Sequence, residues 1–190
     1  MTLILRPEVL THPNIPKPLH GMAPRVLKGD DWWNDVRQKA YASTDYHCYA
    51  CGVHKSKAKK HQWLEAHEGW DINYQTGVCE VVEIVPLCNF CHNFIHSGKL
   101  FMDAGNNKHI TECRRILEHG FRLLRNNNLR CFPGTLEVAN VLEAKTHGVL
   151  PYELNINPDL KWKDYVLVLD GEIWESWFEN EEEWKEFYSK

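Results

Sequence analysis

Two short stretches, C48-Y-A-C51 and C88-N-F-C91, decide how the centre of this chain folds. Each stretch places two cysteines three positions apart, and 36 residues separate Cys51 from Cys88. Two thiolate pairs on tight turns supply the four tetrahedral ligands that zinc prefers, and Gly52 eases the first of these turns. The pattern therefore predicts a structural zinc site formed by Cys48, Cys51, Cys88 and Cys91.

The rest of the sequence favours metal binding over disulfide formation. The chain begins MTLILRPEVL, without the basic segment and long apolar core of a signal peptide. No stretch approaches the ~20 apolar residues of a membrane span. We therefore expect an intracellular protein with no membrane partner, and in such proteins paired cysteines more often bind metal. Three further cysteines lie outside the paired spacing and are expected to be small apolar core residues: Cys79, Cys113 and Cys131.

Three histidines accompany the cysteines. His92 follows Cys91 directly, and His96 lies four residues further on, so both share one face of a helix. His67 ends a short apolar run that is typical of a strand, in L64-E-A-H67. Imidazoles from a strand and a helix can meet at a second metal ion, which can polarise a phosphate and activate water. In the alternative interpretation, His67 is an ordinary core or surface histidine.

The order of these motifs resembles that of the zinc-stapled HNH endonucleases. The resemblance covers about residues 45–98: C-x2-C-G, then L-E-A-H, a hairpin, and P-L-C-x2-C-H-x3-H. It implies an α+β fold around a small, treble-clef-like ββα-metal module. It also implies metal-dependent hydrolysis of DNA phosphodiester bonds in the cytoplasm of a bacterium or a phage-infected cell. By the same resemblance, His67, His92 and His96 are catalytic and hold a divalent ion such as Mg, Mn, Ni or Zn.

Two positions depart from the pattern of this family. Many members have a second histidine, the general base, where this chain has Glu68, and an asparagine where it has Glu83. Glu68 can serve as the base or as a metal ligand, because carboxylates do both, or it is a surface charge. In another register, His67 is the base and Glu65 or Asp71 is a ligand. A second hypothesis therefore stays open, a catalytically inactive zinc module that binds nucleic acid or a protein partner.

The first half of the chain is expected to contain an arm and the cysteine module. Residues 1–44 hold five of the nine prolines and are predicted to form an extended, proline-rich arm, followed by a helix from Asp30 to about Thr44. Residues 45–98 form the zinc-stapled, HNH-like module. Within it we expect two strands and one short helix, at residues 62–67, 80–86 and 91–96.

The second half divides into a basic and an acidic segment. In residues 99–130, apolar positions spaced three and four apart predict an amphipathic helix over residues 108–126. Residues 131–190 carry 5 Lys or Arg against 13 Asp or Glu, a net charge of −8. This acidic extension is predicted to contain a helix, a hairpin at Asp170-Gly171 and a closing helix, at residues 136–145, 165–174 and 179–188.

A basic loop, K55-S-K-A-K-K-H61, lies between the first cysteine pair and the first expected strand. Its lysines suit contacts with DNA phosphates, unless the loop is merely solvated: Lys55, Lys57, Lys59 and Lys60. Five arginines of the basic segment can extend this surface: Arg114, Arg115, Arg122, Arg125 and Arg130. The acidic extension repels DNA, so we expect it to pack away from this surface or to contact a protein partner.

Overall fold

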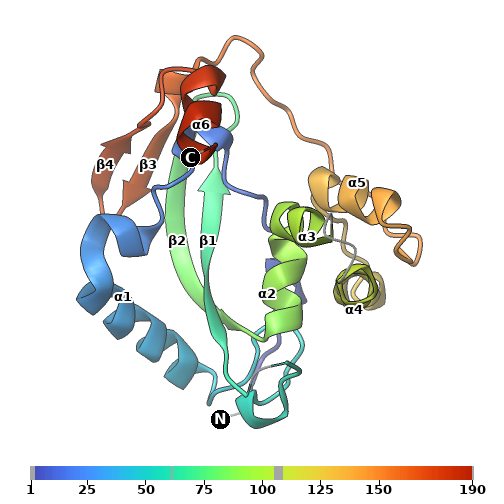
Figure 1. Cartoon of the computed structure of the whole chain (residues 1–190). Coiled ribbons are helices and arrows are strands. Elements are labelled where there is room, and N and C mark those ends of the chain that lie inside the picture. Colours follow the sequence, from blue (N-terminus) through green and yellow to red (C-terminus); the bar gives the residue numbers. More distant parts are fainter. Residues whose placement is uncertain (1–2, 61, 105–108, 190) are drawn as a thin grey trace. The chain divides into compact units, whose positions relative to one another are not determined.

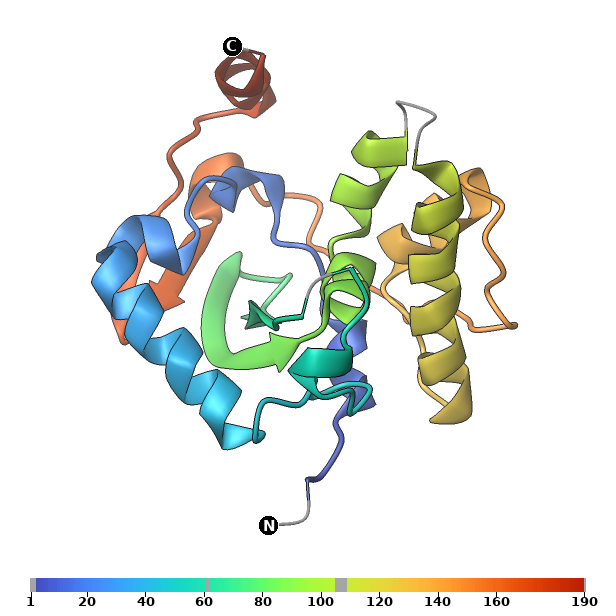
Figure 2. The ribbon, with the colours of Figure 1, turned by 60° about the horizontal axis from the view of Figure 1, so that its bottom comes forward.

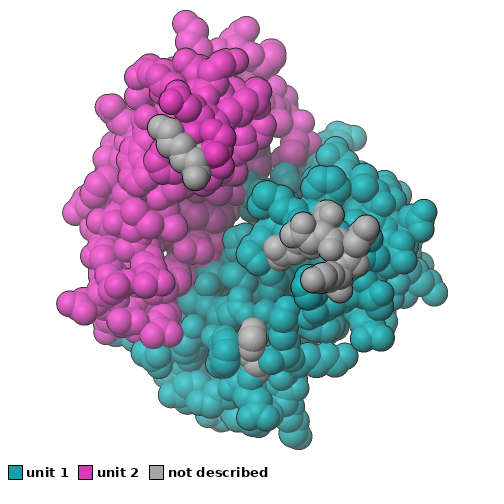
Figure 3. Space-filling model, viewed as in Figure 1, with its two compact units in different colours: residues 1–14, 38–67, 85–153 teal, residues 15–37, 68–84, 154–190 magenta. Residues whose placement is uncertain are grey.

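The computed structural model describes residues 3–60, 62–104 and 109–189. This described part has the predicted α+β composition, with six α-helices and one four-stranded sheet (Figure 1). Its tertiary contacts form two compact units, coloured separately in Figure 3. Unit 1 comprises Met1–Asn14, Gln38–His67 and Val85–Glu153. Unit 2 comprises Ile15–Arg37, Glu68–Ile84 and Leu154–Lys190.

Unit 1 contains the helices α2 (Asn89–Ile95), α3 (Ser97–Ala104), α4 (Ile110–Asn126) and α5 (Pro133–Val141). The α4 helix forms where the apolar spacing predicts it, and that stripe is buried. The α5 helix begins at Pro133, because the fixed φ of proline suits the first helical position. The α3 helix was not expected. The chain was predicted to leave helical structure near Ser97, but a second short helix begins there.

The packing of α4 against α2 depends on a glycine. Phe94 of α2 meets Phe121 of α4 edge to face, with ring centroids 5.2 Å apart. A Cβ added at Gly120 would lie 2.2 Å from the Phe94 ring, so only glycine permits this approach. Figure 2 shows α4 running beside α2. The close contact fixes the position of α4 relative to the helix that carries the second cysteine pair.

The proline-rich arm differs from the extended segment that was expected. It forms two of the short 3-10 helices found in the described residues, which are η1 (Pro7–Thr11), η2 (Lys17–Leu19), η3 (Lys55–Lys57) and η4 (Trp162–Asp164). Val9 and Leu10 are buried in the core of unit 1, and Leu19 and Met22 in that of unit 2. Prolines preset turn geometry, while burial of the apolar residues between them stabilises the packed arm.

The sheet has the strand order β1-β2-β3-β4. Its strands are β1 (Glu65–Ile72), β2 (Val78–Leu87), β3 (Val166–Leu169) and β4 (Glu172–Glu175). The β2 and β3 strands run parallel, with Val78 opposite Val166, whereas β3 and β4 are antiparallel. Asp170 and Gly171 have φ values of 51° and 78°. Two positive φ values are typical of the hairpin turn that the Asp-Gly pair predicts.

The first strand begins and ends later than expected. The sequence predicted a strand that ends at His67, but β1 continues through Ile72. Pairing with β2 stabilises this extension, since an isolated strand has no partner for its backbone groups. His67 therefore lies inside the strand.

Two further helices complete the described fold. The α1 helix (Pro24–Ser43) is interrupted at Gly29, whose φ of 84° and ψ of 171° are not helical. Its longer part thus starts at Asp30, as predicted. The α6 helix (Glu181–Tyr188) is capped by Asn180, whose Oδ1 accepts from the backbone N–H of Glu183 at 3.0 Å. No helix in the described ranges is both long and apolar enough to cross a membrane.

Candidate metal centres

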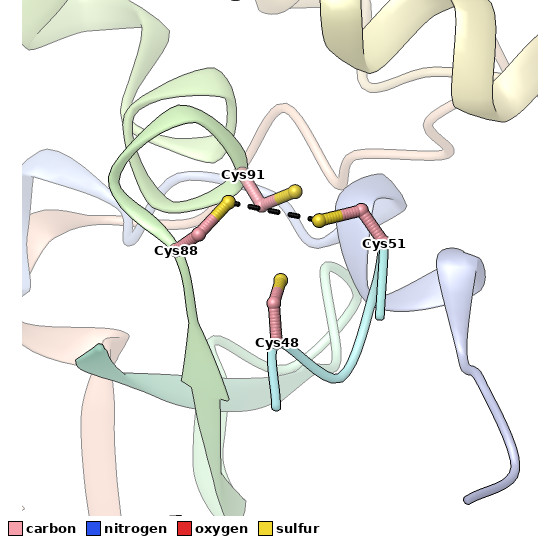
Figure 4. A group of neighbouring side chains, drawn as sticks. All are labelled: Cys48, Cys51, Cys88 and Cys91. Carbon is pink, nitrogen blue, oxygen red and sulfur yellow. Dashed lines mark hydrogen bonds between the residues drawn. The ribbon is translucent and has the colours of Figure 1, made fainter. Parts of the chain in front are cut away.

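The four cysteines of the two predicted pairs meet in unit 1 (Figure 4). The sulfur atoms of this four-cysteine group all lie within 4.8 Å of one another. Cys51 Sγ and Cys88 Sγ are 3.7 Å apart. A tetrahedral zinc ion with Zn–S bonds of about 2.3 Å separates its sulfurs by about 3.8 Å. The four-cysteine group can hold a metal ion, and its geometry is compatible with zinc.

Backbone hydrogen bonds shape the first cysteine turn. Gly52, with a φ of 74°, donates its N–H to the carbonyl of Cys48 at 2.8 Å. Cys48 in turn donates its own N–H to the carbonyl of Val53, also at 2.8 Å. Tyr49 donates to the carbonyl of Pro86, again at 2.8 Å, just before the second pair. The first two bonds shape the turn, and the third joins it to the segment of the second pair without a disulfide.

Buried sulfurs this close cannot all ionise without a compensating positive charge. Hydrogen bonding to Cys48 and then to Cys51 raises the pKa of both Cys88 and Cys91, and burial adds to the rise. Hydrogen bonding, first from Cys48, lowers the pKa of Cys51. Metal ligation requires thiolates. A divalent cation bound here would supply that positive charge.

The three predicted histidines also meet in unit 1, as a three-histidine group of His67, His92 and His96. His67, inside β1, is only 1% exposed. Its Nδ1 lies 3.3 Å from His96 Nε2, and the ring centroids of His92 and His96 are 4.5 Å apart. Among the described residues, His67 Nε2 is buried with no hydrogen-bond partner. The group can hold a metal ion, and Nδ1 is the His67 nitrogen that faces His96.

Glu65 and Asn89 orient one member of the group. Glu65 Oε2 lies 2.6 Å from His92 Nδ1, and the Asn89 side chain donates to Glu65 Oε1 at 2.8 Å. A carboxylate at Nδ1 leaves Nε2 as the ligating nitrogen, an arrangement typical of metal-binding histidines. The sequence raised Glu65 only as an alternative ligand. The sequence feature that could have indicated this role is the position of Glu65, two residues before His67 and on the same face of the strand.

The local environment keeps two of these imidazoles neutral. Burial lowers the pKa of His67 well below its usual value, and repulsion from His96, His92 and His12 adds to this effect. Burial, followed by repulsion from His92, lowers the pKa of His96 to about 4. Neutral imidazole is the form that binds metal. His12, which sequence reasoning missed, stacks on His67 with centroids 5.6 Å apart.

A cavity of about 430 Å³ adjoins the three-histidine group. His92 and His96 form part of its wall. Lys60 and Glu65 also line it. The described lining further includes charged and polar side chains that sequence reasoning did not single out: Asn89, Asn93, Lys99, His109 and Glu112. Its size suits a small ligand or one part of a larger one.

The other acidic residues considered as bases or ligands lie outside the three-histidine group. Glu68 follows His67 on β1, and successive side chains of a strand point to opposite faces. Asp71 is exposed near the end of that strand, and Glu83 lies within β2. The metal-binding groups of the described residues include none of these three. Their catalytic or ligating roles stay predictions.

The predicted basic loop makes several contacts within unit 1. Lys55 Nζ lies 3.7 Å from the centroid of the Tyr46 ring, and Lys60 pairs with Glu112 at 3.1 Å on the cavity wall. The remaining loop lysines are exposed: Lys57 and Lys59. Two arginines of the basic segment have structural contacts, because Arg114 donates to the carbonyl of Leu142 and Arg130 to that of Pro151. Nucleic-acid binding by these residues stays a prediction.

No family model matches this sequence, and neither a curated protein nor a solved structure matches it. Membership of the HNH family therefore stays a prediction from residues 45–98. The structural findings stand on their own, as two groups of side chains that can each hold a metal ion.

Proposed function

We propose that this chain is a metal-dependent endonuclease of HNH type that hydrolyses DNA phosphodiester bonds at the three-histidine group. In this proposal β1, β2 and α2 form the ββα-metal module, and the four-cysteine group is its zinc staple. The observation that carries the proposal is the meeting of three imidazoles beside a cavity, one of them oriented by Glu65. The interpretation of His67 as an ordinary core histidine does not explain why three imidazoles and a carboxylate meet here.

The residues around the group suit phosphodiester chemistry. A divalent ion bound there would polarise a phosphoryl oxygen and lower the pKa of water. Glu65 and Asn89 hold His92 in one orientation, and burial keeps His67 neutral for ligation. Lys60 and Lys99 on the cavity wall would attract a phosphate group.

Three side chains are candidates for the proton acceptor. Glu68 occupies the position of the family's general base, while His109 and Glu112 line the cavity. Glu112 is already engaged in an ion pair with Lys60 at 3.1 Å. We therefore propose His109 or Glu68 as the acceptor. Single substitutions, His109→Gln and Glu68→Gln, separate the two, since only one should abolish cleavage while leaving metal binding intact.

The test is nicking of supercoiled plasmid by purified protein with Mg²⁺, Mn²⁺, Ni²⁺ or Zn²⁺. We expect His92→Ala to reduce nicking at least about 100-fold, because a catalytic metal contributes several kcal/mol. His54→Ala, which changes a histidine outside the group, should retain activity. Nicking that survives His92→Ala in a folded protein with metal still bound to its four cysteines would remove the proposal.

The alternative function is a zinc module that binds nucleic acid without cleaving it. The observation that favours it is the carboxylate at position 68, on the strand face opposite His67. This alternative predicts one zinc ion per chain and no cleavage with any metal. A metal count per chain, with anomalous diffraction at the three-histidine group, distinguishes it from the nuclease. A second ion at that group would count strongly against it.

A further inference from the structure

A histidine of α4 reaches the four-cysteine group. His119 Nε2 lies 3.5 Å from Cys91 Sγ, within hydrogen-bond range for sulfur. The Phe90 ring meets the imidazole edge to face, with centroids 5.7 Å apart and planes at 81°. Sequence reasoning treated the cysteines as a closed set and gave His119 no role. Cys91 is 28 residues away in the chain, so no local spacing pattern reveals the contact.

The packing of α4 on α2 places this imidazole. Gly120, next to His119, faces Phe94 so closely that any side chain there would collide with the ring. Phe90, Cys91 and Phe94 all belong to α2, so one helix supplies the sulfur, the aromatic neighbour and the packing surface. His119 therefore reaches the metal group through a contact in the core, which is more rigid than a surface loop.

The chemistry of a ligated thiolate determines the direction of the hydrogen bond. A metal-bound sulfur carries no proton and can only accept. Nε2 of His119 must then carry the proton, which selects one of the two neutral tautomers. Such a bond draws electron density from the sulfur. It should reduce the reactivity of the thiolate and help to offset the negative charge of four cysteines around one divalent ion.

We propose that His119 is a hydrogen-bond donor to the four-cysteine group: its Nε2–H donates to Cys91 Sγ and ties α4 to the metal site. The contact makes loss of the ion and attack on the thiolates slower. His119 is a positioning residue, since it acts through Cys91. The proposal rests on a metal ion bound by the four cysteines and is independent of nuclease activity.

The first test measures zinc affinity by competition with a chromophoric chelator, and thiol reactivity by alkylation with N-ethylmaleimide. We expect His119→Ala to weaken zinc binding about 10-fold or more, as loss of a hydrogen-bond partner of a metal ligand generally does. His119→Gln, which keeps an N–H donor at similar reach, should restore most of the affinity. Asn126→Ala, at an exposed site on the same helix, is the matched control and should match the unsubstituted protein. Equal zinc affinity and thiol reactivity for His119→Ala would overturn the proposal.

The second test needs no substitution. In the zinc-loaded protein, long-range ¹H–¹⁵N NMR correlations report which nitrogen of His119 carries the proton. We expect the Nε2–H tautomer, and in cadmium-loaded protein a scalar coupling between that proton and the metal through the sulfur. The Nδ1–H tautomer would overturn the proposal. If the unsubstituted protein binds no metal at its cysteines, this proposal fails while plasmid nicking still tests the nuclease independently.

Discussion

Glu65 is the side chain expected to influence metal affinity at the three-histidine group most directly. Its carboxylate lies against His92 Nδ1 and is itself held by Asn89. We expect Glu65→Gln to weaken metal binding at the three-histidine group about 10- to 100-fold, because the neutral amide no longer orients and polarises the imidazole. Titration calorimetry with Mn²⁺ or Ni²⁺ measures this loss. Glu137→Gln, at an exposed position of α5, is the control, and equal affinities for the two variants would contradict the role of Glu65.

Gly120 is the residue on which the packing of α4 against α2 most depends. We expect Gly120→Ala to lower the free energy of unfolding by about 1–3 kcal/mol, because the new methyl group overpacks against Phe94. Urea denaturation followed by circular dichroism measures the change. Gly98→Ala is a matched control, since nothing lies within 4 Å of its added Cβ. That variant should be neutral or slightly stabilising, because alanine favours the helix. A neutral Gly120→Ala would mean that α4 is not closely packed on α2.

At the scale of elements, the attachment of α6 depends on a neutral histidine in unit 2. Trp184 Nε1–H of α6 donates to His20 Nδ1 at 3.1 Å. Burial lowers the pKa of His20 from 6.5, and nearby Lys17 lowers it further against the opposing effect of the Ile15 carbonyl. Lys17 also pairs with Glu181, and Tyr188 faces the His20 ring. Protonation of His20 would therefore remove an acceptor that α6 uses.

The sign of the resulting pH dependence follows from the lowered pKa. Below pH 6.5 the unfolded chain binds a proton at His20 that the folded chain resists, so stability falls as the pH falls through this value and below. We expect faster exchange of the Trp184 indole proton at about pH 5 than at about pH 7, measured by NMR and corrected for intrinsic exchange. His20→Asn, which keeps an acceptor but does not titrate, should lack this change. An identical pH response in both proteins would rule out His20 as its source.

The basic loop is the element whose proposed function is easiest to test. Lys57 and Lys59 are exposed. Lys55 packs on Tyr46, and Lys59 Nζ lies 5.2 Å from the centroid of the Phe90 ring. If the loop contacts DNA, each Lys→Ala change at positions 57 and 59 should reduce the slope of log affinity against log salt by about 1. Fluorescence anisotropy with duplex DNA at several salt concentrations measures this slope. Lys145→Ala, which is exposed elsewhere in unit 1, should leave the slope unchanged, and unchanged slopes for all three would contradict the proposed surface.

At the scale of the whole molecule, both metal groups belong to unit 1, although the chain passes between the two units five times. Seven of the eight tryptophans belong to unit 2, and Trp63 alone to unit 1. A structural zinc ion contributes apparent binding energies of about 10–16 kcal/mol in small zinc peptides, which rivals the net stability of a domain. Loss of the ion should therefore destabilise unit 1 before unit 2.

We expect chelation of the metal bound by the four cysteines to lower the melting temperature and to abolish amide-exchange protection first in α2 and the Cys48–Cys51 turn. Hydrogen exchange with mass spectrometry resolves these segments. Tryptophan fluorescence, which reports mainly on unit 2, follows the remaining structure in the same samples. Unchanged exchange in α2 after complete removal of the metal would show that the four cysteines need no ion to hold their fold.

The sequence by itself determined the features that depend on short-range spacing. The two cysteine pairs predicted a metal-binding group, the apolar stripe predicted α4, and Asp170-Gly171 predicted its hairpin, because each pattern lies within one turn or helix. The pair His92 and His96 shares a helix face for the same reason. These predictions needed no knowledge of which distant segments meet.

Only the tertiary structure decided which distant residues meet. It paired β2 with β3 in parallel, buried the proline-rich arm, and brought Glu65 to His92 and His119 to Cys91. Local patterns do not contain such contacts, because packing of whole helices and strands selects them. The spacing of the cysteines predicts their shared role, whereas the contacts of Glu65 with His92 and of His119 with Cys91 became visible only when α4 and β1 were placed against α2.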